Sequence, residues 1–336
     1  MVVPLRGDGL CLNQVELTAV PRGTPGRPGK GCTMNKLATE AKTVSLVLGS
    51  GGARGLAHIG IIRWLEEHGY QIRSVSGCSM GALIGGIYAA GKLPEYEQWV
   101  RRIDKLGVFS LLDFTFGRGG LVRGEKLIAT LRELVGETLI EELPITFTAV
   151  AADIVREREV WLNKGPLFDA IRASISLPLF FTPFNYQGIN LIDGSIFNPV
   201  PIAPTFHDLT DLTIAVNLNG PPEYAVAAGS DEGQVVSAAE EAQTFGEKIR
   251  KFIADLQNGE SEPPGDKWDM FYVVNQSFDA MQGLVARQKL AAHPPDLLIS
   301  IPRNACGTLD FDRAAEMIAR GYQAAEEQLG RGSRPR

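Results

Sequence analysis

Short apolar runs alternate with longer amphipathic stretches along the chain from Val44 onward. An apolar run of four to eight residues between turn residues is typical of a buried strand, whereas apolar positions three and four apart indicate a helix with one buried face. Strands that alternate with helices predict a parallel sheet covered on both faces, and therefore an α/β fold. The expected strands are 43–48, 72–76, 145–151, 158–162, 189–192, 212–218 and 296–301, and the expected helices are 55–68, 80–90, 94–104, 123–135, 166–174, 238–257, 269–290 and 311–329.

Two regions depart from this alternation. Residues 1–41 are rich in Gly, Pro and Arg and lack apolar periodicity, which predicts a disordered leader whose Met34 is a candidate for the true start. Residues 221–260 begin as a loop and continue into an amphipathic helix, which either packs on its own core or acts as a lid that seeks lipid. We expect residues 261–330 to add helices and a strand to the same domain as residues 42–220.

The composition is that of an ordinary globular protein, with 44% hydrophobic and 21% charged residues. A net charge of -6 gives no support for a nucleic-acid partner and no long-range attraction to an anionic membrane. No apolar run approaches the roughly 20 residues that a membrane-spanning helix needs, and residues 1–33 lack the apolar segment of a signal peptide. We expect a cytoplasmic protein whose contact with a membrane is transient, peripheral and apolar.

The cysteines and histidines give little from which to build a metal site. The four cysteines lack C-x-x-C spacing, which argues against a zinc site and against a disulfide framework. The four histidines form no H-E-x-x-H motif. We therefore expect no metal, and we expect Cys78 to be a small buried packing residue.

Two of the expected strands run into glycine-rich turns that carry candidate chemistry. The first strand is followed by G-S-G-G-A-R-G at 49–55, and the second by G-C-S-M-G at 77–81. The second turn has the G-x-S-x-G form of a nucleophile elbow, in which Gly77 and Gly81 leave room for a sharp strand-to-helix turn that projects the central side chain. Ser79 is therefore the candidate nucleophile.

The first glycine turn is suited to bind either a phosphate or an oxyanion. The phosphate reading is weak, because a Walker loop needs a lysine that is missing here, and the third glycine of a dinucleotide fingerprint would fall at Arg54. The backbone N–H groups of Gly51, Gly52 and Ala53 suit a developing oxyanion, and Gly51 and Gly52 are favoured because they lack side chains. Three residues are expected to support this loop: Gly49, Arg54 and Gly55.

A third turn, D-G-S at 193–195, follows the expected strand at 189–192. The order G-G-x-R-G, G-x-S-x-G and D-G resembles the patatin-like phospholipase family, whose members are serine acyl hydrolases with a Ser–Asp dyad. The resemblance covers about residues 44–201 well and is looser to about Leu329. Ser195 departs from the family, which tends to carry Gly or Ala at that position.

The resemblance implies a three-layer α/β fold with a mostly parallel central sheet of six or seven strands, and it assigns residues 42–220 to the catalytic core. It implies that Asp193 is the base bonded to the Ser79 hydroxyl, that the substrate is a lipid or other acyl ester, and that no cofactor is needed. In the family's glycine loop a basic residue stands where this chain has Arg54. That side chain either ties the loop to nearby carbonyls or contacts a phosphate headgroup.

Two alternatives remain open at this point, as does the oligomeric state. An α/β-hydrolase esterase would need a histidine after the acid, and His207 and His293 lie downstream of Asp193, while His58 lies in the helix after the glycine loop. A non-catalytic scaffold could retain the same fold. Intact Ser79 and Asp193 speak against the scaffold.

Overall fold

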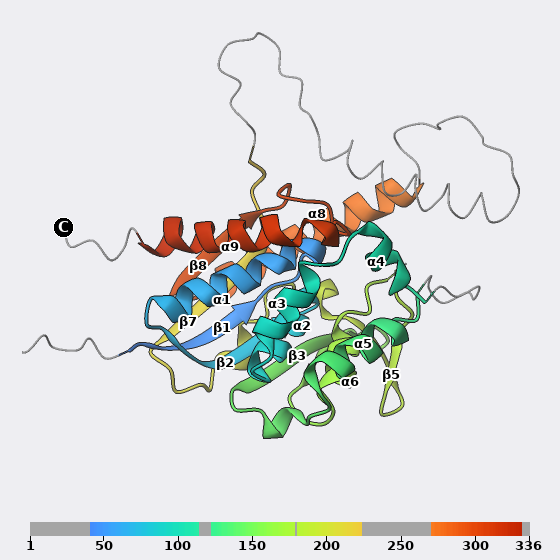
Figure 1. Ribbon diagram of the computed structural model, residues 1–336, viewed down its shortest axis with the longest axis horizontal. Helices are drawn as coiled ribbons and strands as arrows, with labels where there is room; N and C mark the ends of the chain where they lie inside the picture. Colours follow the sequence, from blue (N-terminus) through green and yellow to red (C-terminus); the bar gives the residue numbers. More distant parts are fainter. Residues whose placement is uncertain (1–40, 114–121, 179, 224–269, 331–336) are drawn as a thin grey trace, which may run out of the picture. The chain divides into compact units, whose positions relative to one another are not determined.

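The computed structural model describes residues 41–113, 122–178, 180–223 and 270–330 (Figure 1). Nearly all of the expected leader, and the whole of the expected helix at 238–257, lie outside these residues.

An eight-stranded sheet forms the centre of the described part of the chain. Its strand order is β5-β6-β3-β2-β1-β7-β8, and β4 also pairs with β3. The pairings from β3 through β2, β1 and β7 to β8 are parallel, whereas β4 and β6 run antiparallel to β3, and β5 runs antiparallel to β6. The expectation of a mostly parallel sheet is confirmed, whereas the sheet has eight strands in place of the six or seven expected. The strands are β1 (Thr43–Leu48), β2 (Gln71–Cys78), β3 (Thr146–Asp153), β4 (Arg158–Leu162), β5 (Phe184–Tyr186), β6 (Ile189–Asp193), β7 (Leu212–Gly220) and β8 (Leu297–Pro302).

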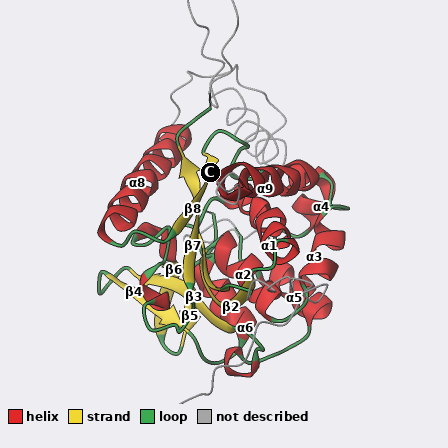
Figure 2. Cartoon of the chain, turned by 90° about the vertical axis from the view of Figure 1, so that its left-hand side faces the viewer, coloured by secondary structure: helices red, strands yellow, loops and turns green. Residues whose placement is uncertain are grey.

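Helices cover both faces of this sheet (Figure 2). The α-helices are α1 (Ala57–Glu67), α2 (Met80–Ala89), α3 (Leu93–Val100), α4 (Lys105–Ser110), α5 (Glu125–Val135), α6 (Leu167–Ser174), α8 (Met270–Ala292) and α9 (Ala314–Leu329). Short 3-10 helices are η1 (Gly52–Leu56), η2 (Ile140–Glu142), η3 (Gly194–Ile196), η4 (Ala203–Thr205) and η5 (Phe311–Arg313).

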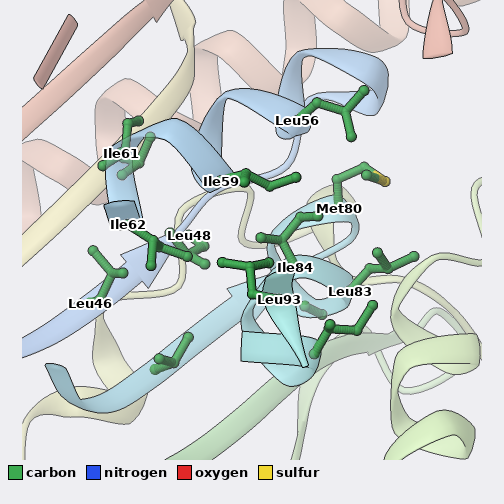
Figure 3. Packing of buried hydrophobic residues seen from close by; sticks show 14 of the residues in the cluster. Leu46, Leu48, Leu56, Ile59, Ile61, Ile62, Met80, Leu83, Ile84 and Leu93 are labelled. Carbon is green, nitrogen blue, oxygen red and sulfur yellow. The ribbon is translucent and has the colours of Figure 1, made fainter. Parts of the chain in front are cut away.

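Side-chain alternation along β1 divides the core between the two faces. Leu46 and Leu48 belong to the large buried cluster that includes residues of α1, α2 and α9, and Figure 3 shows them beside Ile59 and Ile62 of α1. Val47 belongs instead to a smaller cluster that α8 closes. The sheet is therefore buried on both faces, as the near-continuous apolar sequence of its central strands requires.

Two short elements do not follow from the sequence pattern. Strand β5 has only three residues, too few for an alternation to be recognised, and it forms a hairpin with β6 through Gln187 and Gly188, which both have positive φ. Helix α4 has six residues and contains Gly107, whose N–H is capped by the Asp104 carboxylate at 2.7 Å. The expected helix at 55–68 also begins differently, since η1 precedes α1.

Helices α1 and α9 cross in close backbone contact. A Cβ atom at Gly60 would lie 1.9 Å from the Ile318 carbonyl oxygen, and one at Gly321 would lie 2.0 Å from the Ala57 carbonyl oxygen. Both distances are far below van der Waals contact, so only glycine fits at these two positions.

We predict that Gly60→Ala and Gly321→Ala each lower the free energy of unfolding by about 1–3 kcal/mol, because the helices must separate to admit the methyl group. Gly283→Ala is the matched control, since a Cβ there meets only Arg287 Nη1, at 3.6 Å, and alanine favours the helix by up to about 1 kcal/mol. Urea unfolding measures all three. Equal unfolding midpoints for Gly321→Ala and Gly283→Ala would contradict the close crossing.

Candidate functional site

The three turns singled out by the sequence meet at one edge of the sheet. The first two follow the carboxyl ends of the parallel neighbours β1 and β2, where ligands of open α/β sheets bind. The third follows β6, in which Asp193 pairs with Ala151 of β3, while Val150 of β3 pairs with Cys78 of β2. Asp193 therefore lies within one register position of the residue before Ser79, although the two are far apart in sequence.

Ser79 occupies a strained turn between β2 and α2. Its φ of 55° and ψ of -123° lie outside the regions favoured by a residue with a side chain. Its backbone N–H donates to Ser174 Oγ at 2.9 Å, and the Ser174 hydroxyl in turn donates to the Val150 carbonyl at 2.6 Å. Ser79 is partly exposed, whereas Cys78 and Met80 on either side are buried. The turn therefore presents this one side chain toward the outside.

Backbone crowding requires glycine at positions 77 and 81 of this turn. A Cβ atom at Gly77 would lie 2.3 Å from the Gly81 carbonyl oxygen, and one at Gly81 would lie 1.9 Å from the Leu48 carbonyl oxygen at the end of β1. A Cβ at Gly55 would likewise lie 2.4 Å from the Met80 Cβ. These contacts press the first glycine turn against the start of α2, directly beside Ser79.

The Asp193 carboxylate is fully buried. Its Oδ1 accepts the Ser195 N–H at 2.9 Å and the Cys78 thiol at 3.7 Å, whereas Oδ2 has no partner among the described residues. Burial raises the pKa of Asp193, and the nearby hydroxyl of Ser79 is among the groups that oppose this rise. No hydrogen bond of ordinary length joins Ser79 Oγ to Asp193 among the described contacts. The two groups are neighbours, with one carboxylate oxygen left to accept a proton.

The amides of the first glycine turn are not equivalent. The Ala53 N–H donates to the Thr308 carbonyl at 2.8 Å and so is already engaged within the fold. The N–H groups of Gly51 and Gly52 have no acceptor among the described residues. Gly52 has a φ of 56°, and a Cβ there would lie 2.3 Å from the Thr308 carbonyl oxygen. Of the three amides expected to bind an oxyanion, these two are the ones left available.

Arg54 and Gly49 hold this turn in place. The Arg54 side chain is buried, and its Nη1 donates to the carbonyls of Arg303 at 2.9 Å and Cys306 at 3.4 Å. Two roles were considered for Arg54, and these contacts fit the one in which the side chain ties the loop to nearby carbonyls. The Gly49 N–H donates to the Val216 carbonyl at 3.0 Å, which joins the turn to β7.

The histidines contact neither Ser79 nor Asp193 by any described hydrogen bond. His58 is fully buried and donates from Nε2 to the Gly49 carbonyl at 2.9 Å, and burial lowers its pKa to about 4. His68 bonds to the Trp64 carbonyl through Nδ1. His207 and His293 are exposed, and the ring of His293 packs against Phe206. His58 is thus a neutral support of the first glycine turn.

Sequence reasoning missed a polar bridge to the site from α8. The Gln282 side chain is buried, with Oε1 3.3 Å from Ser50 Oγ and Nε2 3.0 Å from Ser195 Oγ. Nothing in the sequence indicates this contact, because a lone glutamine in an amphipathic helix has no motif and lies far along the chain from both serines.

Other parts of the described chain add little to the site. No three His, Cys, Asp or Glu side chains gather within it to hold a metal ion. None of the helices described is long and apolar enough to span a bilayer. A cavity of about 540 Å³ opens beside α3 and α4, lined by Trp99, Arg102 and Leu111 among others, but none of the expected site residues lines it.

Comparison with known proteins identifies sequences and structures that are similar to this chain. The family model for patatin-like phospholipase matches residues 46–206. An uncharacterized NTE family protein of Mycobacterium tuberculosis is 38% identical over 329 residues, which cover 85% of this chain and 91% of that protein. Lysophospholipase nte1 of Neurospora crassa is 28% identical over 92% of this chain, but over only 20% of its own length. Among solved structures, VipD of Legionella pneumophila matches 88% of this chain and 67% of its own, with 15% identity and a TM-score of 0.41.

The buried His58 predicts a loss of stability in acid. Its pKa is about 4 in the folded protein against 6.5 when unfolded, so the unfolded state binds the proton more tightly. The stabilisation is complete above pH 6.5 and falls by up to about 3 kcal/mol as the pH drops toward 4. His58→Gln, whose amide also donates to a carbonyl, should show a flatter dependence. Urea unfolding at several pH values tests this, and parallel curves for the two proteins would contradict it.

Proposed function

Because the chain belongs to the patatin-like phospholipase family, we propose that it hydrolyses a lysophospholipid, a phospholipid or a related carboxylic ester through a Ser79–Asp193 dyad. The observation that carries the proposal is the pairing of a strained, partly exposed serine with a buried carboxylate, one oxygen of which has no partner among the described residues. Ser79 is then the nucleophile, and Asp193 is the base.

In the first half-reaction, Ser79 Oγ attacks the ester carbonyl while Asp193 takes the hydroxyl proton. A serine hydroxyl needs such an adjacent base at neutral pH. Burial raises the pKa of Asp193, which makes its carboxylate a stronger base than an exposed aspartate. Asp193 then returns the proton to the leaving alcohol, and the acyl group remains on Ser79.

The Gly51 and Gly52 amides are the proposed donors to the tetrahedral oxyanion. Both lack an acceptor among the described residues, and their turn is pressed against Met80, next to the nucleophile. Fixed donors of this kind stabilise the charge that develops in the transition state without having to reorganise. In the second half-reaction, Asp193 takes a proton from water, the resulting hydroxide attacks the acyl-enzyme, and the free acid leaves as Ser79 recovers its proton.

A histidine-dependent triad is less well supported by the contacts. His207 and His293, the residues that such a triad would use, are exposed, and none of the described hydrogen bonds joins either to Asp193.

One relative is named a lysophospholipase, and this name supports a lipid ester as the proposed substrate of this chain. We propose that the protein is cytoplasmic and that it reaches this lipid by transient contact with a membrane surface.

Ser79→Ala should abolish ester hydrolysis, with a loss in rate on the order of 10⁶ where the background is low, because no other group forms the acyl-enzyme. Ser277→Ala, which changes an exposed serine of α8, serves as the matched control and should keep wild-type turnover. Hydrolysis of a short-chain nitrophenyl ester and of lysophosphatidylcholine measures both variants. Substantial residual activity in Ser79→Ala would place the nucleophile elsewhere, and inactivity of the wild type on a range of acyl chain lengths would favour a non-catalytic scaffold.

Asp193→Asn keeps the shape of the base but removes its basicity, so we expect it to be nearly as damaging as Ser79→Ala. Combining the two changes should add little further loss, because both groups serve one proton transfer. The four variants His58→Ala, His68→Ala, His207→Ala and His293→Ala should retain the catalytic step, and thermal melts report any loss of stability. A folded His207→Ala or His293→Ala variant with activity as low as that of Ser79→Ala would contradict the dyad and favour a triad.

A further inference from the structure

Helix α8 lies on the face of the sheet opposite α1 and α2 (Figure 2). Its Gln282 side chain reaches two turns of the site. The Ser50 hydroxyl donates to Gln282 Oε1 at 3.3 Å, and Gln282 Nε2 donates to Ser195 Oγ at 3.0 Å. Gln282 is only 7% exposed, so both hydrogen bonds are shielded from water. A buried amide of this kind holds its partners firmly, since losing one of them leaves an unsatisfied polar group.

We propose that Gln282 is a positioning residue of the active site, which ties the Gly51–Gly52 turn to the Asp193 turn and orients the Ser195 hydroxyl toward the carboxylate. The inference rests on the proposed function of Ser79 and Asp193. Gln282 itself touches neither of these residues by any described hydrogen bond, and it acts through the two serines.

Each end of the bridge is attached to a part of the proposed machinery. Ser50 immediately precedes Gly51 and Gly52, the proposed oxyanion donors, and its backbone N–H donates to the Pro199 carbonyl at 2.8 Å, so the turn is held by both backbone and side chain. Ser195 donates its backbone N–H to Asp193 Oδ1 at 2.9 Å. Gln282 therefore sets the spacing between the oxyanion donors and the base.

The direction of the hydrogen bonds also matters for Asp193. Because Ser195 Oγ accepts a hydrogen bond from Gln282 Nε2, its own hydroxyl proton is left to donate to the carboxylate. The Ser195 hydroxyl and N–H both favour the ionised form, and so lower the pKa of Asp193 against the effect of burial. Without the amide, the Ser195 hydroxyl is free to turn away.

Other titratable and charged groups lie near this bridge. The Cys78 thiol and the Ser79 hydroxyl face Asp193 from the end of β2. On α8, Asp279 lies one turn before Gln282 and interacts with Arg54 and Arg303, and two turns after it Lys289 pairs with Glu159 at 2.6 Å. A neutral change at Gln282 leaves all of these groups in place.

Gln282→Met and Gln282→Leu test the proposal, with Gln288→Leu on the exposed side of α8 as the matched control. Both Gln282 variants should lower kcat by about tenfold with a change in KM below about threefold, because the bridge shapes the transition state rather than substrate binding. The acid limb of the pH profile of kcat/KM should move up by about one pH unit, since Asp193 loses a donor and must be ionised to act. Gln288→Leu should match the wild type in both respects.

A double-mutant cycle separates positioning from simple structural support. If Gln282 acts through Ser195, adding Gln282→Met to Ser195→Ala should move the acid limb no further. A fall in kcat with an unmoved acid limb, or a folded Gln282→Met with wild-type kcat, would overturn the proposal.

A second readout does not depend on activity. Carbon-13 NMR of labelled aspartates, with Asp193→Asn to assign the signal, gives the pKa of Asp193 directly, and we expect it to rise by about one unit in Gln282→Met. A wild-type protein without Ser79-dependent hydrolysis would refute the proposed function alone, whereas an unchanged Asp193 titration would refute the role of Gln282.

Discussion

The backbone contact between the end of β1 and the start of α2 fixes the geometry on which the rest of the site depends. The start of α2 lies so close to the end of β1 that a Cβ at Gly81 would be 1.9 Å from the Leu48 carbonyl oxygen, and a Cβ at Gly55 would be 2.4 Å from the Met80 Cβ. The amides of Gly51 and Gly52, which have no acceptor among the described residues, therefore lie in a turn packed against the start of α2, beside Ser79, and this arrangement suits preorganised oxyanion binding.

The carboxylate comes to this arrangement by a different route. Asp193 ends a strand that runs antiparallel to β3, so it depends on the pairing with Ala151 and on the N–H of Ser195 rather than on the glycine contact. Helix α8 then joins the two parts from the opposite face of the sheet through Gln282. The site thus has two parts held by different contacts, and the proposed chemistry places the nucleophile and the oxyanion donors on the first part and the base on the second.

Sequence patterns predicted the parts of this protein that rest on local signals. The limits of β1 and β4 match the expected 43–48 and 158–162, and each run is followed by turn residues, at Gly49 and Asn163. Strand β5 was not predicted, because three residues are too few to show a periodicity. Two contacts were not predicted for another reason: the hydrogen bond of the Ala53 amide and the bridge from Gln282. Each depends on a partner that only the fold brings close.

Labelling with a fluorophosphonate, followed by peptide mapping, tests the central claim most directly, because the reagent bonds only to a serine activated for acyl transfer. The account predicts a single label on the peptide that contains Ser79, absent from Ser79→Ala and formed far more slowly in Asp193→Asn. A label on a different serine, or a folded wild-type protein that takes up no label, would contradict it.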